Sequence, residues 1–262
     1  MQALFKNQNK IFYKQDLIKA LKNLGIKRGD ILFIHSEIYN FGIPLVTPKE
    51  LLRIFLDCFF EVIGKEGTLI MPTFTYSFCD GKDYDKINSK TKVGVLNEFF
   101  RLQPGVKRTN DPIFSCAIKG AKEDLFLQDH DSCFGENSVF DILTKNNGKI
   151  ILFGELWLGV TYIHHIEEKA QVSYRYFKEF QGNIIQEDQN KLPKKIKYFV
   201  RNIDKSSIID LVKLLTFLQK NNNLQISNFS YANIAVIDTL PFFESCVKIL
   251  KHDEKYFLDN QG

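Results

Sequence analysis

The sequence predicts an α/β fold, a single layered α/β/α domain with a mostly central sheet covered by helices. The chain has 262 residues, of which 44% are apolar and 25% charged, a size and composition typical of one large α/β domain. Three short apolar runs, at 31–34, 68–71 and 149–153, show no polar alternation, which indicates strands covered on both faces. Because no linker, low-complexity tract or internal repeat interrupts the chain, we expect one domain over residues 1–262.

Helical patterns lie around these strands in the first half of the chain. Residues 14–24, KQDLIKALKNL, place apolar side chains at helical spacing, with Gly25 where a C-terminal cap belongs. The sequence TPKE then reads as a capping box with Thr47 as the N-cap, followed by a helix over 48–62. The polar stretch DGKDYDKINSK at 80–90 predicts a loop, which we interpret as a mobile flap.

The second half alternates strand and helix patterns from about residue 183 onward. A turn and a strand are expected in NKLPKKIKYFV (190–200), and an amphipathic helix in SSIIDLVKLLTFLQK (206–220). Another strand follows in YANIAVID (231–238), and a last helix in PFFESCVKIL (241–250).

Composition narrows the function classes. The net charge of +4 is a mild excess spread along the chain, so we expect no nucleic-acid partner and a preference for anionic over polycationic ligands. No apolar run approaches the roughly 20 residues that span a membrane, and the five cysteines form no C-x-x-C pair, which favours reduced thiols in a cytoplasmic protein. Phosphate-binding G-x-x-x-x-G-K-[ST] and G-x-G-x-x-G motifs are missing, which argues against nucleotide hydrolysis and dinucleotide redox chemistry. We expect a monomer or a small homo-oligomer.

Polar or glycine-containing segments follow each of the three apolar runs, at 35–42, 72–80 and 154–167. In α/β sheets, ligands bind beyond the carboxyl ends of the strands. We therefore expect these three segments to form one site.

The segment TYIHHIEEKA (161–170) contains the densest set of ionisable side chains. In a helix with Thr161 as its N-cap, His164 shares a face with Glu167 and Glu168. A neutral imidazole beside an orienting carboxylate is what a general base requires. A solvated polar helix face explains the same spacing, so the spacing alone does not choose between the two.

A metal site is a further alternative, using His164 or His165 with Glu168. Zinc in a catalytic site takes three protein ligands, and the H-E-x-x-H motif is absent. His35 can in principle complete such a set, but the sequence gives no reason to place it there, and we expect no metal. The histidines outside the segment are scattered: His35, His130 and His252.

Nucleophilic catalysis has weaker signals. His35 and Ser36 are adjacent, but the G-x-S-x-G nucleophile elbow is missing, and a serine at such a turn is more often a cap or a phosphate donor. A cysteine paired with a histidine is conceivable, yet most free cysteines are small buried hydrophobic residues. We expect Cys116, in FSCAIKG, to lie in the core.

Five segments, taken in order, resemble the aminoglycoside 3-N-acetyltransferase family. They are GDILFIHSEIYNFG (29–42), GTLIMPTFTYSF (67–78), RTNDPIFSCAIKG (108–120), CFGENSVFDILTKNNGKIILFGE (133–155) and TYIHHIEE (161–168). The resemblance covers about half of the chain. It implies a single α/β domain that uses an acyl-coenzyme A donor to acylate a primary amine, and it differs from acetyltransferases with an R/Q-x-x-G-x-G/A loop, which this chain lacks.

The family's T-x-x-H-x-x-E pattern falls on Thr161, His164 and Glu167. The resemblance therefore makes His164 the general base and Glu167 its partner, with no role for His165. It also implies the residues beside coenzyme A, which we expect to be His35, Ser36, Glu37, Phe41, Gly42, Thr73, Phe74, Thr75 and Ser115. On the acceptor side we place Tyr76, Arg108, Asp111, Glu155 and Arg175.

The chain departs from the family pattern near the expected acceptor. Glu37 replaces a serine of H-S-S, Asp111 replaces the histidine of a His-Pro pair, and Val139 replaces the proline of a Ser-Pro pair. Basic residues lie near the same segments: Lys107, Arg108, Arg175 and Lys178.

These departures and basic residues favour an anionic acceptor, a nucleotide-linked amino sugar of a bacterial surface polysaccharide. The alternative is an aminoglycoside 3-N-acetyltransferase that confers antibiotic resistance. A hypothesis from another class is a non-catalytic binder that keeps the fold. In the enzymatic hypotheses, transfer is direct, with His164 taking the amine proton and Glu167 stabilising the imidazolium.

Overall fold

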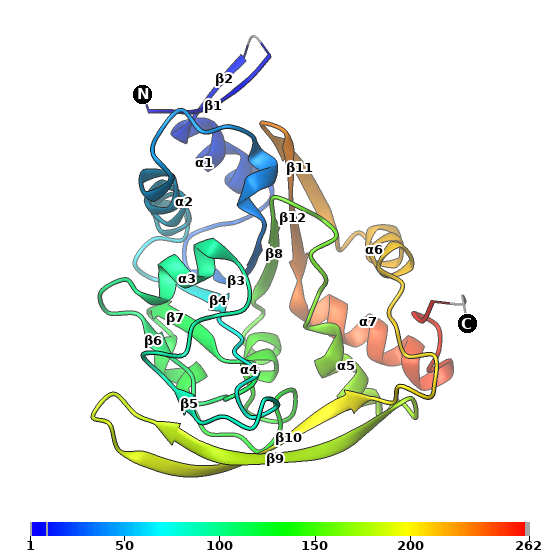
Figure 1. The fold of residues 1–262 in the computed structure, drawn as a ribbon. Coiled ribbons are helices and arrows are strands. Elements are labelled where there is room, and N and C mark those ends of the chain that lie inside the picture. Colours follow the sequence, from blue (N-terminus) through cyan, green and yellow to red (C-terminus); the bar gives the residue numbers. More distant parts are fainter. Residues whose placement is uncertain (1, 9, 260–262) are drawn as a thin grey trace.

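A seven-stranded mixed sheet forms the centre of the computed structural model, which describes residues 2–8 and 10–259 (Figure 1). Its strands are β3 (Ile31–Ser36), β4 (Thr68–Pro72), β6 (Lys107–Arg108), β7 (Cys116–Gly120), β8 (Lys149–Phe153), β11 (Gln225–Phe229) and β12 (Ala232–Asp238). Their order is β11-β12-β8-β3-β4-β7-β6. Strand β3 pairs in parallel with both β4 and β8, and the outer pairs are antiparallel. The predicted α/β fold with a central sheet is confirmed.

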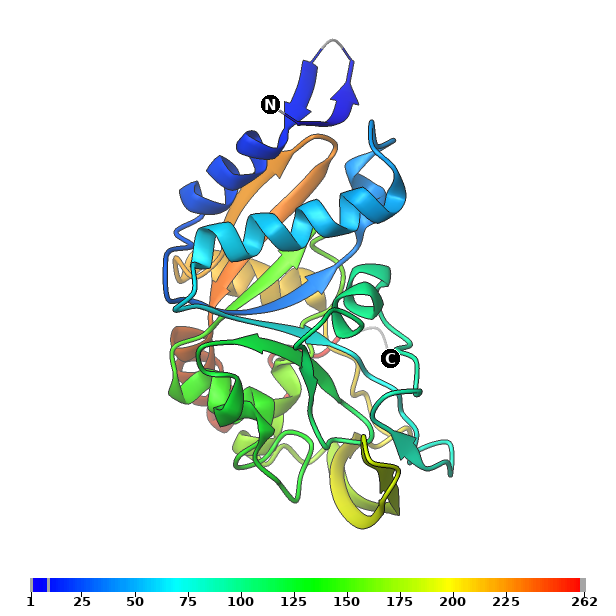
Figure 2. The same cartoon turned by 90° about the vertical axis from the view of Figure 1, so that its left-hand side faces the viewer.

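Helices cover both faces of this sheet. One core contains side chains of α1 (Lys14–Asn23), α2 (Pro48–Ile63) and α3 (Val95–Arg101), and Figure 2 shows α1 and α2 in front of the sheet. The other core contains side chains of α4 (Val139–Lys145), α5 (Ile163–Ala170), α6 (Leu211–Lys220) and α7 (Thr239–His252). Strand β3 contributes to both cores, because successive side chains of a strand point to opposite faces of the sheet: Leu32 packs in the first core and Phe33 in the second.

A long hairpin lies apart from the central sheet and crosses below it in Figure 1. It consists of β9 (Arg175–Ile185) and β10 (Lys191–Arg201), with the short β5 (Tyr84–Asp85) along its edge. A second hairpin of β1 (Ala3–Asn7) and β2 (Lys10–Tyr13) projects at the opposite end. Two 3-10 helices complete the elements, η1 (Ile38–Phe41) and η2 (Glu123–Leu127). Over the described residues, no helix combines the length and apolarity that a membrane span requires.

The predicted capping box at the start of α2 is confirmed. The Thr47 hydroxyl accepts from the Glu50 backbone N–H, and the Glu50 carboxylate accepts from the Thr47 N–H at 3.0 Å. Strand β8 has the predicted bounds, whereas β3 continues two residues beyond the predicted end at 34, through Ser36. Main-chain pairing with β8 extends β3, because His35 and Ser36 pair with Leu152 and Phe153.

The segment at 80–90, expected to be a loop, contains the short strand β5 and is hydrogen-bonded to the body of the protein. The buried Arg108 guanidinium donates to the carbonyl oxygens of Lys86 at 3.1 Å and Ser89 at 2.6 Å. Arg101 donates to the carbonyl oxygen of Ile87 at 2.7 Å. Three charge-assisted hydrogen bonds along four residues hold this loop in one conformation.

Candidate active site

The three segments expected at the site meet at the carboxyl ends of β3, β4 and β8. Asn40 donates to the Glu155 carboxylate at 3.3 Å, and the backbone N–H of Glu37 donates to the Phe153 carbonyl at 2.8 Å. Asn97 of α3 connects the end of β3 with the end of β4, because its side chain accepts from the Ser36 hydroxyl and donates to the Pro72 carbonyl at 2.7 Å. Parallel pairing brings these strand ends to one edge of the sheet.

His164 and Glu167 form a hydrogen-bonded pair on α5. Nδ1 of His164 lies 2.6 Å from Oε2 of Glu167, one helical turn later. With Nδ1–H donating to this carboxylate, Nε2 carries the lone pair that accepts a proton. The side chain of His164 is 24% exposed, while Glu167 is completely buried. The pair therefore has an accessible base and an inaccessible carboxylate.

Glu167 stays ionised in the protein interior because its neighbours outweigh its burial. Burial opposes ionisation, but the hydrogen bond of His164 and the charge and hydrogen bond of Arg175 hold the pKa of Glu167 below its usual value. Nε of Arg175 lies 2.8 Å from Oε2 of Glu167, and the hydroxyl of Tyr174 donates to Oε1 at 3.0 Å. Arg175 also donates to the Phe199 carbonyl of β10 at 3.2 Å. Consecutive residues of the β9 start therefore position the carboxylate that orients His164.

His164 lines a pocket of about 400 Å³. Its walls come from the segment before α5, from β10 and from the segment before α6: Gly159, Val160, Thr161, Ile163, Arg175, Tyr198, Val200, Arg201, Ser207, Ile208, Ile209 and Leu211. No carboxylate lines it. The expectation that Thr161 caps α5 is wrong: the N-cap is Tyr162, in helical conformation and without a side-chain cap bond.

The neighbouring His165 faces a different environment. It is 4% exposed, its Nδ1 lies 2.6 Å from the Phe134 carbonyl, and its ring stacks on Phe243. Burial lowers its pKa, so the ring is neutral. A residue one position along a helix points about 100° away, which separates the two histidines.

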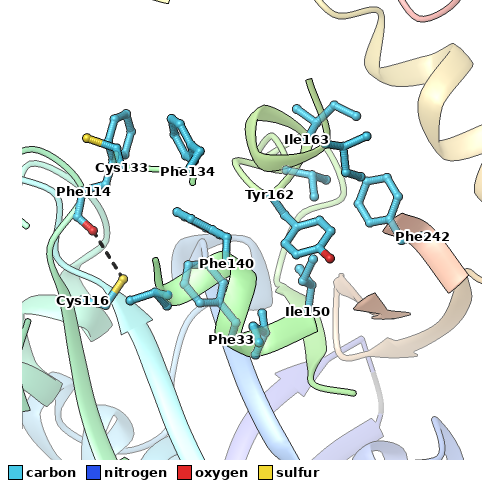
Figure 3. Packing of buried hydrophobic residues seen from close by; sticks show 14 of the residues in the cluster. Phe33, Phe114, Cys116, Cys133, Phe134, Phe140, Ile150, Tyr162, Ile163 and Phe242 are labelled. Atoms are coloured by element: carbon cyan, nitrogen blue, oxygen red, sulfur yellow. Dashed lines mark hydrogen bonds between the residues drawn. The ribbon is translucent and has the colours of Figure 1, made fainter. Parts of the chain in front are cut away.

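Aromatic rings connect His164 with His35 at the end of β3. The His164 ring packs against Phe134, Phe134 against Phe140, Phe140 against Phe33, and Phe33 against His35, with centroid distances of 5.1–5.5 Å. Figure 3 shows Phe33, Phe134 and Phe140 as neighbours within this apolar layer. Both histidines thus border the core on the α5 side of the sheet.

His35 and Ser36 point to opposite faces of the sheet, as consecutive strand residues must. Burial lowers the pKa of His35 to about 4, and its Nε2 has no hydrogen-bond partner among the described residues. Ser36 instead donates to Asn97 at 2.8 Å in the core on the α2 and α3 side. A nucleophile pair of these two residues is therefore excluded.

The segment expected beside the donor after β4 is buried and bonded internally. The Thr73 hydroxyl donates to the Ser115 carbonyl at 3.1 Å, and the Ser115 hydroxyl donates to the Thr73 carbonyl at 2.6 Å. The Thr75 hydroxyl donates to the Pro112 carbonyl at 2.9 Å. Phe74 is 3% exposed. Glu37 accepts from the Tyr39 N–H and begins η1, Phe41 is fully buried, and Gly42 ends η1 with φ 100° against the ring of Tyr231.

Two residues expected on the acceptor side, Arg108 and Asp111, make hydrogen bonds within the protein. The Arg108 guanidinium donates hydrogen bonds to Thr73 and to carbonyl oxygens of the loop at 80–90, and it lies over the Tyr84 ring. Asp111 accepts from the N–H groups of Ile113 and Phe114 and faces His130 at 3.2 Å. Both are more than nine-tenths buried.

The other residues expected there differ in their accessibility. Arg175 is committed to Glu167 and to the backbone of β10. Glu155 accepts from the N–H groups of Leu156 and Trp157 at the start of an exposed loop. Tyr76 is partly buried against Phe114. The sequence did not indicate Phe134 and Asn97, because their contacts with His164 and Ser36 join segments far apart in the chain. Tyr174 lies only seven residues after its partner Glu167, but in a turn outside the helical spacing that relates His164 to Glu167.

A zinc site has no support within residues 2–8 and 10–259, where no group of three potential ligands is close enough to hold a metal ion. Cys116 lies in the core as expected, and burial raises its pKa well above the usual value. Burial does the same to Cys133. Neither thiol is in the form that attacks an acyl group.

Residues 33–251 match the family model described as aminoglycoside 3-N-acetyltransferase. The chain is 26% identical over 204 residues to aminoglycoside N(3)-acetyltransferase VII of Streptomyces paromomycinus, covering 70% of this chain and 69% of that protein. It is 26% identical over 178 residues to the SPbeta prophage-derived aminoglycoside N(3')-acetyltransferase-like protein YokD of Bacillus subtilis, covering 59% of this chain and 64% of that protein, less than two thirds of its length.

Solved structures share the fold. AAC-IIIb in binary complex with CoASH superposes with a TM-score of 0.78 at 21% identity, covering 93% of this chain and 97% of that one. AAC-VIa bound to sisomicin superposes with a TM-score of 0.77 at 18% identity, covering 91% of this chain and 97% of that one.

Proposed function

The chain belongs to the aminoglycoside 3-N-acetyltransferase family, and on this premise we propose that it transfers an acyl group from acyl-coenzyme A to a primary amine of a cationic amino sugar. One observation carries the proposal: His164 is accessible and is hydrogen-bonded at 2.6 Å to a buried carboxylate that remains ionised. A solvated polar helix face does not bury Glu167 or surround it with Tyr174 and Arg175.

The proposed acceptor is a cationic amino sugar, not the nucleotide-linked sugar that the net charge of the chain favours. The relatives described above are an aminoglycoside acetyltransferase and a protein described as like one, and these activities support the aminoglycoside alternative. Net charge is a sum over the whole surface and does not describe the charge inside one pocket. Arg108, one of the basic residues behind the nucleotide argument, is bonded internally.

His164 acts as the general base. As the acceptor nitrogen attacks the thioester carbonyl carbon, its proton moves to Nε2 of His164, the carbon–sulfur bond breaks and coenzyme A leaves as the thiolate. Glu167 stabilises the imidazolium that forms and keeps the ring in one orientation. Arg175 and Tyr174 hold Glu167 in place. The step needs no covalent enzyme intermediate and no metal ligand set.

Acyl-coenzyme A fits the residues present in two ways. The pocket beside His164 is largely apolar with Arg201 at its rim and no carboxylate, which suits an acyl-pantetheine group and repels no phosphate. His35, the residue that the family resemblance places beside the donor, has an unpartnered Nε2 that can accept a hydrogen bond from an amide N–H. The structure of AAC-IIIb in complex with CoASH, which has the same fold, supports the same co-substrate.

A coenzyme A release assay tests this function. We expect release from acetyl-coenzyme A with sisomicin as acceptor, and none above background with a nucleoside diphosphate-linked amino sugar. Release with the nucleotide-linked sugar alone would overturn the acceptor class. Calorimetric binding of sisomicin and acetyl-coenzyme A without any release would instead identify a non-catalytic binder.

A further inference from the structure

Glu168, next to the proposed catalytic carboxylate, is a buried acid without a cationic partner. It is 8% exposed, and its Oε2 accepts one hydrogen bond, from the Ser132 hydroxyl at 2.8 Å. Across residues 2–8 and 10–259, no lysine, arginine or histidine forms an ion pair with it. Burial raises its pKa, opposed only by the Ser132 hydrogen bond. A buried carboxylate in this state gains from any cation that reaches it.

A glycine leaves the second oxygen of this carboxylate uncovered. A Cβ atom placed on Gly135 would lie 2.7 Å from Oε1 of Glu168 and 2.9 Å from Cβ of Ser132. Any larger residue would therefore press against the carboxylate. The absent side chain at 135 keeps room beside Oε1.

Two pockets, of about 520 and 420 Å³, meet at this point, and both are lined by Gly135, Glu136 and Glu168. Their acidic lining comprises Asp129, Asp131, Glu136, Asp141 and Glu168, and their basic lining comprises Lys145, Lys169 and Lys197. Asp141 pairs with Lys145 at 2.7 Å, and Asp129 pairs with Lys194 at 2.5 Å, so Asp131, Glu136 and Glu168 are the carboxylates of this lining that form no ion pair among the described residues. The larger pocket is also lined by His165, which is 4% exposed and whose Nε2 is an unpartnered acceptor.

This acidic region lies beside the proposed base. Glu168 follows His164 by four positions on α5, a spacing that puts Cβ atoms about 5–6 Å apart on one helix face. Phe134 lines the larger pocket and packs against the His164 ring at 5.4 Å.

We propose that Glu168 binds a second, non-reacting ammonium group of the acceptor and thereby selects acceptors that carry more than one amine. The inference rests on the proposed function and names the part of the acceptor that the chain recognises. An ammonium at Oε1 supplies the missing cation, and a neighbouring N–H or O–H of the same ligand supplies the donor that Nε2 of His165 lacks. The pocket beside His164, which lacks carboxylates, remains for the acyl donor.

Equilibrium calorimetry with sisomicin, without acyl-coenzyme A, tests the proposal. Glu168→Gln keeps the acceptor for Ser132 and removes the charge, so sisomicin should bind about 10- to 100-fold more weakly, the usual effect of losing one charge-assisted hydrogen bond. Glucosamine, which has a single amine, should bind wild type and variant equally. Glu179→Gln is the matched control, because it removes an exposed carboxylate that lines neither pocket and should leave sisomicin binding unchanged.

Two further variants protect the test against misfolding. Glu136→Gln changes an exposed residue that lines both pockets and should weaken sisomicin binding severalfold. Gly135→Ala crowds Oε1 and should weaken it while keeping every charge. Unchanged affinity for sisomicin in folded Glu168→Gln and Glu136→Gln would overturn the proposal. Because no acyl donor is present, this outcome is independent of whether sisomicin is acetylated, which the release assay decides separately.

Discussion

The completely buried carboxylate of Glu167 lies 2.6 Å from Nδ1 of His164, which leaves Nε2 as the nitrogen free to accept a proton on a ring that lines the pocket. The hydrogen bond is local, between residues three apart on α5, whereas the surroundings of the carboxylate come from β9 and β10. Orientation of the base therefore depends on the hairpin as well as on the helix.

Replacing His164 by Ala should lower kcat by about 10²- to 10⁴-fold, the usual contribution of a positioned general base. Binding of acetyl-coenzyme A should persist, since the imidazole is not required to hold the donor. Steady-state kinetics and calorimetry measure the two quantities. His252→Ala, at the exposed end of α7, is the control and should behave as wild type. A fully active His164→Ala enzyme would exclude the proposed base.

Arg175→Ala should destabilise the fold by about 3–5 kcal/mol, because it removes the guanidinium that pairs with the buried Glu167 carboxylate and leaves that charge with only the hydrogen bonds of His164 and Tyr174. Urea unfolding measures the change. Arg28→Ala removes an exposed ion pair with Glu66 and should change the unfolding free energy by less than about 1 kcal/mol. Equal effects of the two substitutions would show that Arg175 does not stabilise the buried carboxylate.

His35 should make the protein less stable as the pH falls from 6.5 toward 4. Burial lowers its folded-state pKa from 6.5 to about 4, so in this window the unfolded chain binds a proton that the folded protein does not. Stability is thus fully present above pH 6.5 and declines below it, by about 3 kcal/mol at the lower limit. Unfolding measured against pH should show this slope in wild type and a shallower one in His35→Asn. Parallel slopes would mean that His35 is charged in the folded protein.

Glu168→Gln should raise the melting temperature at pH 7. Burial raises the folded-state pKa of Glu168 above 4.5, so this carboxyl lowers the stability of the folded protein once the pH rises above the unfolded-state pKa, and pH 7 lies in that range. The difference between variant and wild type should shrink as the pH falls below 4.5, where Glu168 is protonated in both states. A lower melting temperature of the variant at pH 7 would indicate a cationic partner within the protein.

Arg108→Ala should release the loop at 80–90. The substitution removes the guanidinium from the carbonyl oxygens of Lys86 and Ser89, and limited proteolysis should then cleave this loop faster. Lys107→Ala, which removes an exposed ion pair with Asp124, is the adjacent control and should leave the cleavage rate unchanged. Equal cleavage rates in the two variants would show that Arg108 does not hold the loop at 80–90 in place.

The sequence predicts elements well where a single local signal decides them. The capping box at Thr47 and the apolar run of β8 are examples, since neither depends on distant residues. Helix α4 and strand β9 have no clear sequence signal: α4 is one short run of seven residues, and β9 has only two buried residues and shows no apolar face. The hairpin pairing with β10, rather than its own pattern, makes β9 a strand.

In the candidate site, too, the sequence indicates the residues that are related by local spacing and does not indicate those whose contacts depend on the folded loops. The spacing of His164 and Glu167 is visible in the sequence because both lie on one helix. The roles of Arg108 and Asp111 are not, because the carbonyl and amide groups that engage them are set by the folding of loops. A buried arginine and an exposed one look identical in a sequence.

The position of β8 has a consequence for how the chain folds during synthesis. This strand pairs on one side with β3, more than a hundred residues earlier, and on the other with β12, some eighty residues later. Until the ribosome has released residue 238, one edge of β8 has no partner, and its apolar side chains are a surface for association with other nascent chains. Such long-range pairing also slows folding. The demand for chaperones should therefore fall sharply once β12 has emerged.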